Sequence, residues 1–278
     1  MSIRDIVRTA LRQAADSLES KPREGFVYDQ LNELYRSFMQ RAGDDLRNSY
    51  TWGAIHAAHL AKALGHDRVS LLEFGVAGGR GLLALDRVAG LLSEHWGIQV
   101  EVYGFDTGQG LPRPIDYRDL PNLWVEGQFP MDRAKLESRL ERAKLVIGHI
   151  KDTLSDFMAG SPAPVGFVSI DLDLYSSTKD ALKLLDGPSS LLLPRIQYYF
   201  DDIQGFTFSE FNGERLAIDE FNHEHDKRKI SPIYGLRHFV PAEESDHQWV
   251  ELFYMAHLFD HEQYNQPDGL LTRTRLDI

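Results

Sequence analysis

Apolar and polar residues change their spacing near residue 69 of the chain. Before that point, apolar side chains recur every three or four residues, which is the spacing of amphipathic helices. The first two predicted helical faces consist of Ile6, Leu11, Ala14, Ala15 and Leu18, and of Leu31, Leu34, Tyr35 and Phe38. A third helix is predicted over Trp52–Leu64 and ends at Gly65. Residues 1–68 are therefore predicted to form an N-terminal helical extension.

From Val69 onward, short apolar runs alternate with helical segments. The predicted strands are Val69–Phe74, Val100–Phe105, Leu145–Ile147, Val165–Ile170 and Gln197–Phe200. The segments between them are long enough for crossover helices, for example Arg133–Ala143 and Ser176–Leu185. Strands that alternate with helices are typical of a parallel sheet covered on both faces. The pattern thus predicts an α/β fold with a mostly parallel sheet.

The C-terminal part has a different pattern. Ile230–Val240 and Trp249–Phe259 are two extended runs joined by the polar loop 241–247. This arrangement predicts an antiparallel hairpin at the edge of the sheet. Because no linker or repeat interrupts the chain, residues 69–278 are predicted to form one domain behind the helical extension.

The composition excludes several classes of function. The 278 residues include no cysteine, so the chain has no disulfide framework, thiolate nucleophile or cysteine-ligated zinc site. A formal net charge of −12 argues against a nucleic-acid partner, because such binding depends on clustered Lys and Arg. The chain has no apolar stretch of the ~20 residues that span a bilayer, and its N-terminus lacks a secretory signal pattern. We therefore expect a cytoplasmic protein with neither a membrane nor a nucleic-acid partner.

Two pairs of acidic residues follow two of the predicted strands. Asp171 and Asp173 come after Val165–Ile170, and Asp201 and Asp202 come after the run that ends at residue 200. Neighbouring parallel strands deliver the residues at their carboxyl ends to one rim, where open α/β sheets bind ligands. Several carboxylates gathered there would repel one another unless a cation lay between them. The two pairs therefore predict a site for a hard divalent metal ion.

A glycine-rich turn links the first predicted strand to the next helix. Glu73, Gly75 and Gly79 form the pattern acid-x-Gly-x-x-x-Gly, which is more typical of S-adenosylmethionine (SAM) sites than of dinucleotide sites. Further along, Asp106 ends the second predicted strand, where a carboxylate can accept both ribose hydroxyls of a cofactor. The alternative for Asp106 is a turn-forming role, because Thr107-Gly108 follows it. The order of the glycine turn and the acid favours a SAM site.

At these motifs the chain resembles the macrocin O-methyltransferases, which are SAM- and metal-dependent enzymes that methylate sugar hydroxyls on natural products. The matching stretches are Glu73-Phe-Gly75-Val-Ala-Gly-Gly79, Asp106-Thr-Gly-Gln-Gly-Leu-Pro112, Lys151-Asp-Thr-Leu154, Ile170-Asp-Leu-Asp-Leu-Tyr-Ser-Ser-Thr-Lys-Asp-Ala-Leu182, Phe200-Asp-Asp202 and Ala217-Ile-Asp-Glu-Phe221. They extend over about residues 70–225. The resemblance implies a class I methyltransferase (Rossmann-like) fold with a reversed hairpin at the C-terminus.

The resemblance also assigns roles by position. The cofactor-binding residues that it implies are Glu73, Gly75, Ala77, Gly79, Asp106 and Asp152. It implies Asp171, Asp201 and Asp202 as metal ligands, and an all-oxygen set favours Mg²⁺ over zinc. The chain departs from the family before the last parallel strand, where Leu193-Pro-Arg-Ile196 replaces the usual Pro-Gly-Gly turn.

Three further residues near the rim have more than one possible role. Asp173 could orient a metal ligand, act as general base, or cap the helix predicted over Ser176–Leu185. His149 could act as base, contact the adenine ring, or be a structural histidine. Asp152 could contact the cofactor or cap a helix that begins at Thr153.

The function predicted from the sequence is SAM- and Mg²⁺-dependent O-methylation of a hydroxylated small molecule, with a sugar or a glycosylated metabolite as the favoured acceptor. The alternatives are a catechol-type O-methyltransferase of the same fold, a SAM-fold protein that binds without turnover, and a nucleotide-binding dehydrogenase. The N-terminal helices could form a lid over the acceptor or an interface in a homo-oligomer.

Overall fold

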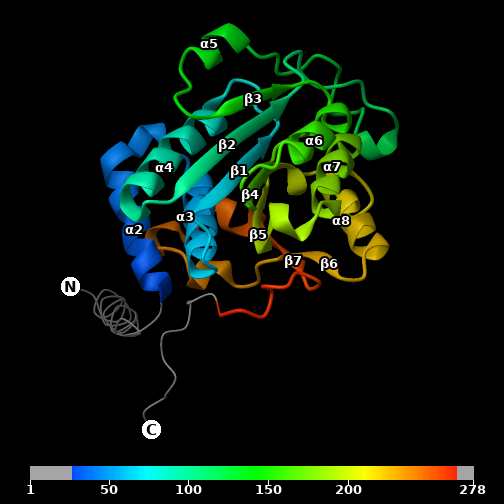
Figure 1. Ribbon diagram of the computed structural model, residues 1–278. Helices are drawn as coiled ribbons and strands as arrows, with labels where there is room; N and C mark the ends of the chain where they lie inside the picture. Colours follow the sequence, from blue (N-terminus) through cyan, green and yellow to red (C-terminus); the bar gives the residue numbers. More distant parts are fainter. Residues whose placement is uncertain (1–26, 268–278) are drawn as a thin grey trace, which may run out of the picture.

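Seven strands form one sheet in the computed structural model, which describes residues 27–267 (Figure 1). The strands are β1 (Arg68–Phe74), β2 (Gln99–Asp106), β3 (Lys144–Ile147), β4 (Val165–Ile170), β5 (Leu192–Phe200), β6 (Arg228–Pro232) and β7 (Phe253–Leu258). Their order across the sheet is β3-β2-β1-β4-β5-β7-β6. The first five strands run parallel, and β7 runs antiparallel to both of its neighbours. The predicted parallel sheet is therefore confirmed, strand by strand.

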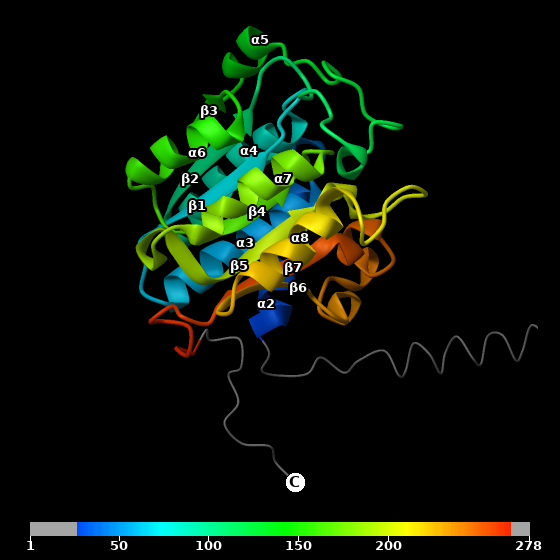
Figure 2. The same ribbon diagram turned by 90° about the vertical axis from the view of Figure 1, so that its right-hand side faces the viewer.

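Helices cover both faces of this sheet. They are α2 (Val27–Ala42), α3 (Asn48–Ala63), α4 (Arg80–Trp96), α5 (Arg133–Glu137), α6 (Ile150–Ala159), α7 (Tyr175–Leu182) and α8 (Gly213–Glu224). In Figures 1 and 2, α3 and α4 lie on one face with α2 outside them, and α6, α7 and α8 lie on the other. Within residues 27–267, no helix combines the length and apolar character that a membrane crossing requires.

The second and third predicted N-terminal helices are present as α2 and α3. Leu31, Tyr35 and Phe38 are buried on α2, and α3 packs against β1, β4 and β5. Both helices share one hydrophobic core with the sheet. The first predicted helix, on residues 6–18, lies outside the described residues. A lid or interface role for this part of the chain stays a prediction.

One predicted crossover helix is much shorter than its apolar pattern indicates. The prediction covered Arg133–Ala143, but α5 ends at Glu137. The buried carboxylate of Asp86 on α4 accepts hydrogen bonds from the backbone N–H groups of residues 141–143, at 2.6 to 2.9 Å. Because those amides bind a side chain from another element, the segment leaves the helical path.

The C-terminal hairpin pairs antiparallel, as predicted, but its strands are shorter than the runs Ile230–Val240 and Trp249–Phe259. Strand β6 ends at Pro232, which has no N–H to offer a neighbouring strand. The remaining parts of the two runs include 3₁₀ turns at Leu236–His238 and Gln248–Leu252. Strand β7 inserts between β5 and β6.

The strand register sets the position of the acidic residues. Phe74 at the end of β1 pairs with Ile170 of β4, and Ile170 pairs with Phe200 of β5. The next residues of β4 and β5, Asp171 and Asp201, therefore emerge side by side at one rim of the sheet. This rim includes the boundary between β1 and β4, where the strand order reverses, and open α/β sheets bind their ligands at such a switch point.

Candidate active site

A cavity of about 1030 Å³ opens at the rim. Its wall includes most of the residues predicted from the sequence, namely Gly75, Ala77, Asp106, His149, Asp171, Asp173, Asp201 and Asp202. The structure does not bring Glu73, Gly79 or Asp152 to this wall. The volume lies at the upper end of the range for small-molecule sites, so both a cofactor and an acceptor can be accommodated.

Gly75 and Gly79 meet different requirements of the turn after β1. Gly75 has a φ of +87°, and a Cβ atom there would lie 1.8 Å from the carbonyl oxygen of Asp171. Gly79 has a φ of +82° and precedes α4, where a Cβ would lie 2.3 Å from a methyl group of Leu136. Gly75 therefore lets the turn contact the β4 rim, and Gly79 lets the start of α4 pack against α5.

Asp106 binds the glycine turn through its carboxylate. Its Oδ2 accepts hydrogen bonds from the backbone N–H groups of Val76 and Ala77, both at 2.9 Å. Its Oδ1 accepts from the N–H of Gly108 at 2.6 Å. The turn-forming role is thus confirmed. Because Asp106 also lines the cavity, the ribose contact stays a prediction that the turn role does not exclude.

Glu73 lies beneath the turn and faces α3. Its side chain is 1 % exposed, and its Oε1 accepts a hydrogen bond from the Tyr50 hydroxyl at 2.9 Å. The Ser169 hydroxyl donates in turn to Tyr50, at 2.6 Å. Burial raises the pKa of the Glu73 carboxyl to about 8, so this group is mostly protonated at neutral pH. Glu73 therefore supports the turn from the core.

Asp171, Asp201 and Asp202 form a tight group of carboxylates. One oxygen from each lies within 4.8 Å of the others, and all three residues are partly exposed to solvent. Burial, followed by repulsion from Asp201 and Asp202, raises the pKa of Asp171 to about 7. Burial and neighbouring aspartates also raise the pKa of Asp202 well above its usual range. The protein alone thus leaves this concentration of negative charge poorly compensated.

The donor set fits a hard divalent cation. Three carboxylates without His or Cys match the preference of Mg²⁺ for oxygen ligands. Asp201 also has protein partners, because the Tyr199 hydroxyl donates to its Oδ1 at 2.8 Å. The guanidinium Nη2 of Arg47, at the start of α3, lies 3.9 Å from the same oxygen. The three aspartates are therefore the residues that would hold a metal ion.

Asp173 contacts Asp202 and does not cap the next helix. Helix α7 begins at Tyr175 with Leu174 in the N-cap position, so the predicted capping role is wrong. The backbone N–H of Asp173 donates to Oδ2 of Asp202 at 3.0 Å, and the two side chains are also hydrogen-bonded. Asp173 has a φ of +63°, which is an unfavourable conformation for a residue with a side chain. This backbone geometry places its carboxyl group at the cavity wall.

The cap of α7 comes from Asp119, a residue that the sequence reasoning missed. Its Oδ1 accepts from the backbone N–H of Ser176 at 2.8 Å, and its Oδ2 accepts from the Ser176 hydroxyl at 3.0 Å. Asp119 ends the short 3₁₀ turn Tyr117–Asp119, 57 residues before Ser176 in the chain. No local spacing pattern could have found this contact, because the fold alone brings the two segments together.

His149 and Asp152 lie at the start of α6. His149 occupies the N-cap position, is exposed and lines the cavity. The helix begins at Ile150, so the prediction that Asp152 caps a helix starting at Thr153 is wrong. Asp152 is an exposed residue of the first helical turn. A cofactor contact by Asp152 stays a prediction.

The segment between β2 and α5 forms another part of the cavity wall. It contributes Ile115, Trp124 and Phe129, and the 76 % exposure of Ile115 places that side chain at the solvent boundary. Arg113 from this loop and Lys151 from α6 add positive charge. The cavity thus combines apolar, cationic and acidic surfaces, which suits a polar molecule with an apolar part.

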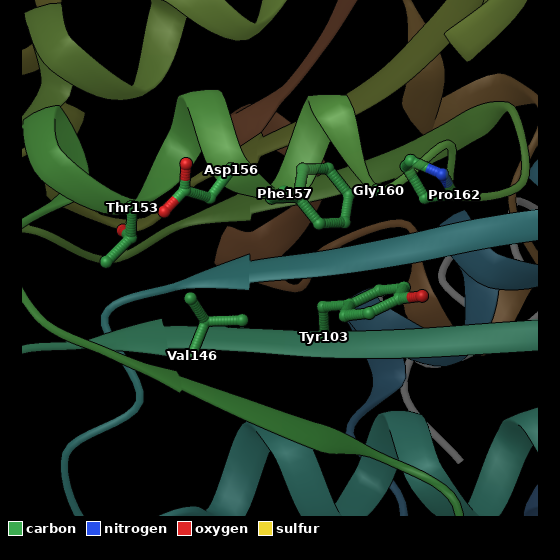
Figure 3. A pocket seen from close by; sticks show the side chains of 7 residues that line it. All are labelled: Tyr103, Val146, Thr153, Asp156, Phe157, Gly160 and Pro162. Carbon is green, nitrogen blue, oxygen red and sulfur yellow. The ribbon is translucent and has the colours of Figure 1, made fainter.

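A second, smaller cavity of about 310 Å³ lies between α6 and the strands β2 and β3. Figure 3 shows Tyr103 and Val146 on the strands facing Thr153, Asp156 and Phe157 on the helix. Among the described residues, Asp156 is the only carboxylate in this wall, and no histidine joins it there. This second cavity therefore lacks the grouped polar side chains that line the cavity at the rim.

The chain is similar to known proteins in structure. No protein-family model and no curated protein sequence matches the chain. The crystal structure of CalS11, a calicheamicin methyltransferase, is 20% identical and has a TM-score of 0.51, with 75% of this chain and 88% of that chain covered. The O-methyltransferase NovP is 19% identical, with coverages of 70% and 71% and a TM-score of 0.43. An apo structure of CalS11, as a TDP-rhamnose 3'-O-methyltransferase, is 18% identical, with coverages of 75% and 89% and a TM-score of 0.43.

The strand order and the likeness to the first CalS11 structure agree on the fold. A mostly parallel sheet with helices on both faces and an inserted antiparallel last strand is the class I methyltransferase (Rossmann-like) arrangement. The fold predicted from the sequence is therefore confirmed.

Proposed function

We propose that this protein is a SAM-dependent O-methyltransferase that holds Mg²⁺ with Asp171, Asp201 and Asp202. The observation that carries the proposal is a single cavity whose wall includes both the glycine turn with Asp106 and these three carboxylates. The fold likeness to CalS11, a calicheamicin methyltransferase, supports the class of reaction.

Different residues of the rim would bind the two reactants. Gly75, Ala77 and Asp106 would bind the cofactor, which supplies the methyl group. The three aspartates would hold the metal ion, which when bound orients an acceptor hydroxyl and lowers its pKa. Methyl transfer is an in-line displacement, in which the bond from the acceptor oxygen to the methyl carbon forms as the sulfur–carbon bond breaks. Holding both reactants in one cavity supplies the alignment that this step requires.

The acceptor hydroxyl must also lose its proton. Asp173 and His149 both line the cavity, and either side chain could accept that proton directly or through water. The favoured acceptor is a sugar or a glycosylated metabolite, which follows from the resemblance to macrocin O-methyltransferases. The mixed apolar and charged wall supports an acceptor of this kind.

The proposal is tested by methyl transfer from isotopically labelled SAM to a panel of sugars, glycosylated metabolites and catechols. We expect transfer to a sugar hydroxyl in Mg²⁺ and none in EDTA. Transfer to catechols alone would favour the catechol-type alternative. SAM binding without transfer to any compound would favour a binding protein. Calorimetry that detects tight NAD binding and no SAM binding would overturn the proposal.

A further inference from the structure

The segment between β2 and α5 contains a loop that is closed at its base. The two limbs of the loop join where the backbone N–H of Leu111 donates to the carbonyl oxygen of Gln128 at 2.8 Å. We call residues 111–128 the wall loop. Ile115 lies in its first limb and Trp124 in its second, and both residues line the cavity at the rim. The shape of this part of the cavity therefore depends on what holds the wall loop in place.

The wall loop carries many exposed apolar side chains for its length. Ten large apolar side chains are exposed among the described residues, and the four on this loop are Ile115, Tyr117, Leu123 and Val125. Exposed apolar side chains that gather in one segment mark a binding surface more often than ones scattered singly. Because the loop is continuous with the cavity wall, the occupant that the structure favours is the methyl acceptor.

One buried position connects the wall loop to the rest of the domain. Of residues 111–128, all of which the structure describes, only Asp119 and Leu120 are buried. The carboxyl Oδ2 of Asp119 accepts a hydrogen bond from the backbone N–H of Ile115, within the loop, at 2.8 Å. The same carboxyl group accepts the two bonds from Ser176 that cap α7. Asp119 therefore joins an apolar residue of the cavity wall to the start of a helix.

A second contact between the loop and α7 lies nearer the surface. Arg118 lies over the ring of Tyr175, 4.7 Å from its centre, and its Nη1 donates to the Tyr175 hydroxyl at 3.3 Å. Arg118 is partly exposed, whereas the side chain of Asp119 is 1 % exposed. Because water competes less for buried hydrogen bonds, we expect Asp119 to contribute more to the position of the loop.

We propose that Asp119 is a positioning residue for the methyl acceptor, which holds the wall loop against α7 so that Ile115 and Trp124 bind the apolar part of that acceptor. The inference rests on the proposed function, because it takes the cavity at the rim as the acceptor site. Asp119 acts through the loop, since it does not itself line the cavity. Its role follows from two acceptor oxygens that lie between two segments of the chain.

The first measurement tests the anchor without any ligand, in the wild type and in Asp119→Asn. Asparagine keeps the volume but has one acceptor oxygen, so it cannot accept from the backbone N–H groups of both Ile115 and Ser176 in the observed geometry. Hydrogen exchange, followed by mass spectrometry, should become at least about fivefold faster in residues 111–128, because about one hydrogen bond is lost. Exchange in β4 should stay unchanged.

The second measurement tests the acceptor role with two glycosides of one sugar that the wild type methylates. The probes are the 4-nitrophenyl glycoside, which has an apolar aromatic group, and the methyl glycoside. In Asp119→Asn we expect the KM of the 4-nitrophenyl glycoside to rise about 10-fold, with kcat and the dissociation constant of SAM changed less than about threefold. A displaced wall loses binding that the ground state and the transition state share, so the loss is in KM. The KM of the methyl glycoside should change less than about threefold, because it lacks the aromatic group.

Two further variants separate the anchor from the apolar surface. Ile115→Ser keeps the N–H that donates to Asp119, so hydrogen exchange should match the wild type, but the KM of the 4-nitrophenyl glycoside should rise about fivefold. Asp132→Asn is the matched control, because Asp132 also caps a helix, α5, at 3.2 Å from the backbone N of Lys135, and lies outside the wall loop and the cavity wall. That control should match the wild type in both measurements.

Four outcomes would overturn the inference. Unchanged hydrogen exchange in Asp119→Asn would show that Asp119 does not hold the loop. Faster exchange with an unchanged KM would show that the loop does not bind the acceptor. A lower kcat with an unchanged KM would indicate partial unfolding, which reduces the amount of active enzyme. A wild type that methylates no sugar or glycoside would refute the proposed acceptor class itself, and this failure is distinguishable because the other three require a wild type that transfers methyl groups.

Discussion

The carboxylates in two halves of the same rim have opposite surroundings. At the ends of β1 and β2, Asp106 accepts hydrogen bonds from three backbone N–H groups of neighbouring turns. At the ends of β4 and β5, Asp171 and Asp202 lie against other carboxylates, and their pKa values are raised. After the proposed function, we call these the cofactor half and the metal half.

The difference shows which half is complete without a ligand. Backbone amides stabilise a carboxylate within the protein, so the cofactor half keeps its shape whether or not a cofactor is bound. The grouped carboxylates repel one another and have fewer donors than Asp106, so we expect the metal half to gain stability when protons or a cation bind there. Each prediction below tests one half or the contact between them.

The largest effect is expected from Asp171→Asn in the metal half. If the proposed metal site is correct, turnover should fall by at least about 10³-fold, because metal stabilisation worth several kcal/mol would be lost. The metal-free protein should melt at the same or a higher temperature, since one repelling charge is gone. Labelled methyl transfer and thermal melting measure the two quantities. Equal turnover in Asp171→Asn and in the wild type would mean that the metal half does not depend on a bound ion for activity.

Gly75→Ala tests the contact between the halves. The added Cβ would overlap the carbonyl oxygen of Asp171, and alanine disfavours the φ of +87°. We expect a loss of about 4 kcal/mol in the free energy of unfolding, measured by urea denaturation. SAM and metal binding should both weaken, because the contact joins the two segments that we propose as their sites. A loss below about 1 kcal/mol would mean that the two halves adjust independently.

Glu73→Gln tests the core beneath the cofactor half. Below pH 4.5 the carboxyl is protonated in both the folded and the unfolded chain. Between pH 4.5 and about 8 only the unfolded chain releases its proton, so the wild type loses stability as pH rises and levels off above that range. At pH 7 this loss amounts to about 3 kcal/mol.

Glu73→Gln should escape this loss, because glutamine does not titrate and its oxygen can still accept from Tyr50. Urea denaturation at pH 5 and pH 8 should show a stability gain over the wild type that grows with pH. SAM affinity should stay within about threefold of the wild type, since Glu73 is outside the cavity wall. A pH-independent difference would show that Glu73 is ionised in the folded protein.

The sequence predicted the features that depend on periodicity and on strand ends. Buried strands such as β4 are continuous apolar runs, and the acids that follow them must reach one rim because parallel strands end together. The same reasoning could not predict the contacts that Asp86, Asp119 and Glu214 make. Each is an acid within or before a helix, and its partners lie in another element.

Asp173 and Asp152 show the limit of local reasoning at helix starts. An acid shortly before or within a first turn is a frequent cap, and both were open to that interpretation. The observed helices begin one to three residues earlier than the predicted ones, at Tyr175 and Ile150. That shift removes both acids from the capping position. The left-handed backbone of Asp173 depends on packing at the rim, which no sequence pattern reports.

The smallest effect is expected on SAM affinity, when the two acids that the resemblance assigns to the cofactor are each replaced. Asp106→Ala should raise the dissociation constant of SAM about 10- to 100-fold, because the support of the glycine turn and the predicted charge-assisted hydrogen bonds to the ribose would both be lost. Asp152→Asn is the matched comparison: the resemblance predicts weaker SAM binding, whereas the exposed position of Asp152 outside the cavity wall predicts a change of less than about twofold. Isothermal titration calorimetry measures both. Weaker binding in Asp152→Asn would extend the cofactor half onto α6, and unchanged binding in Asp106→Ala would move the cofactor away from β2 altogether.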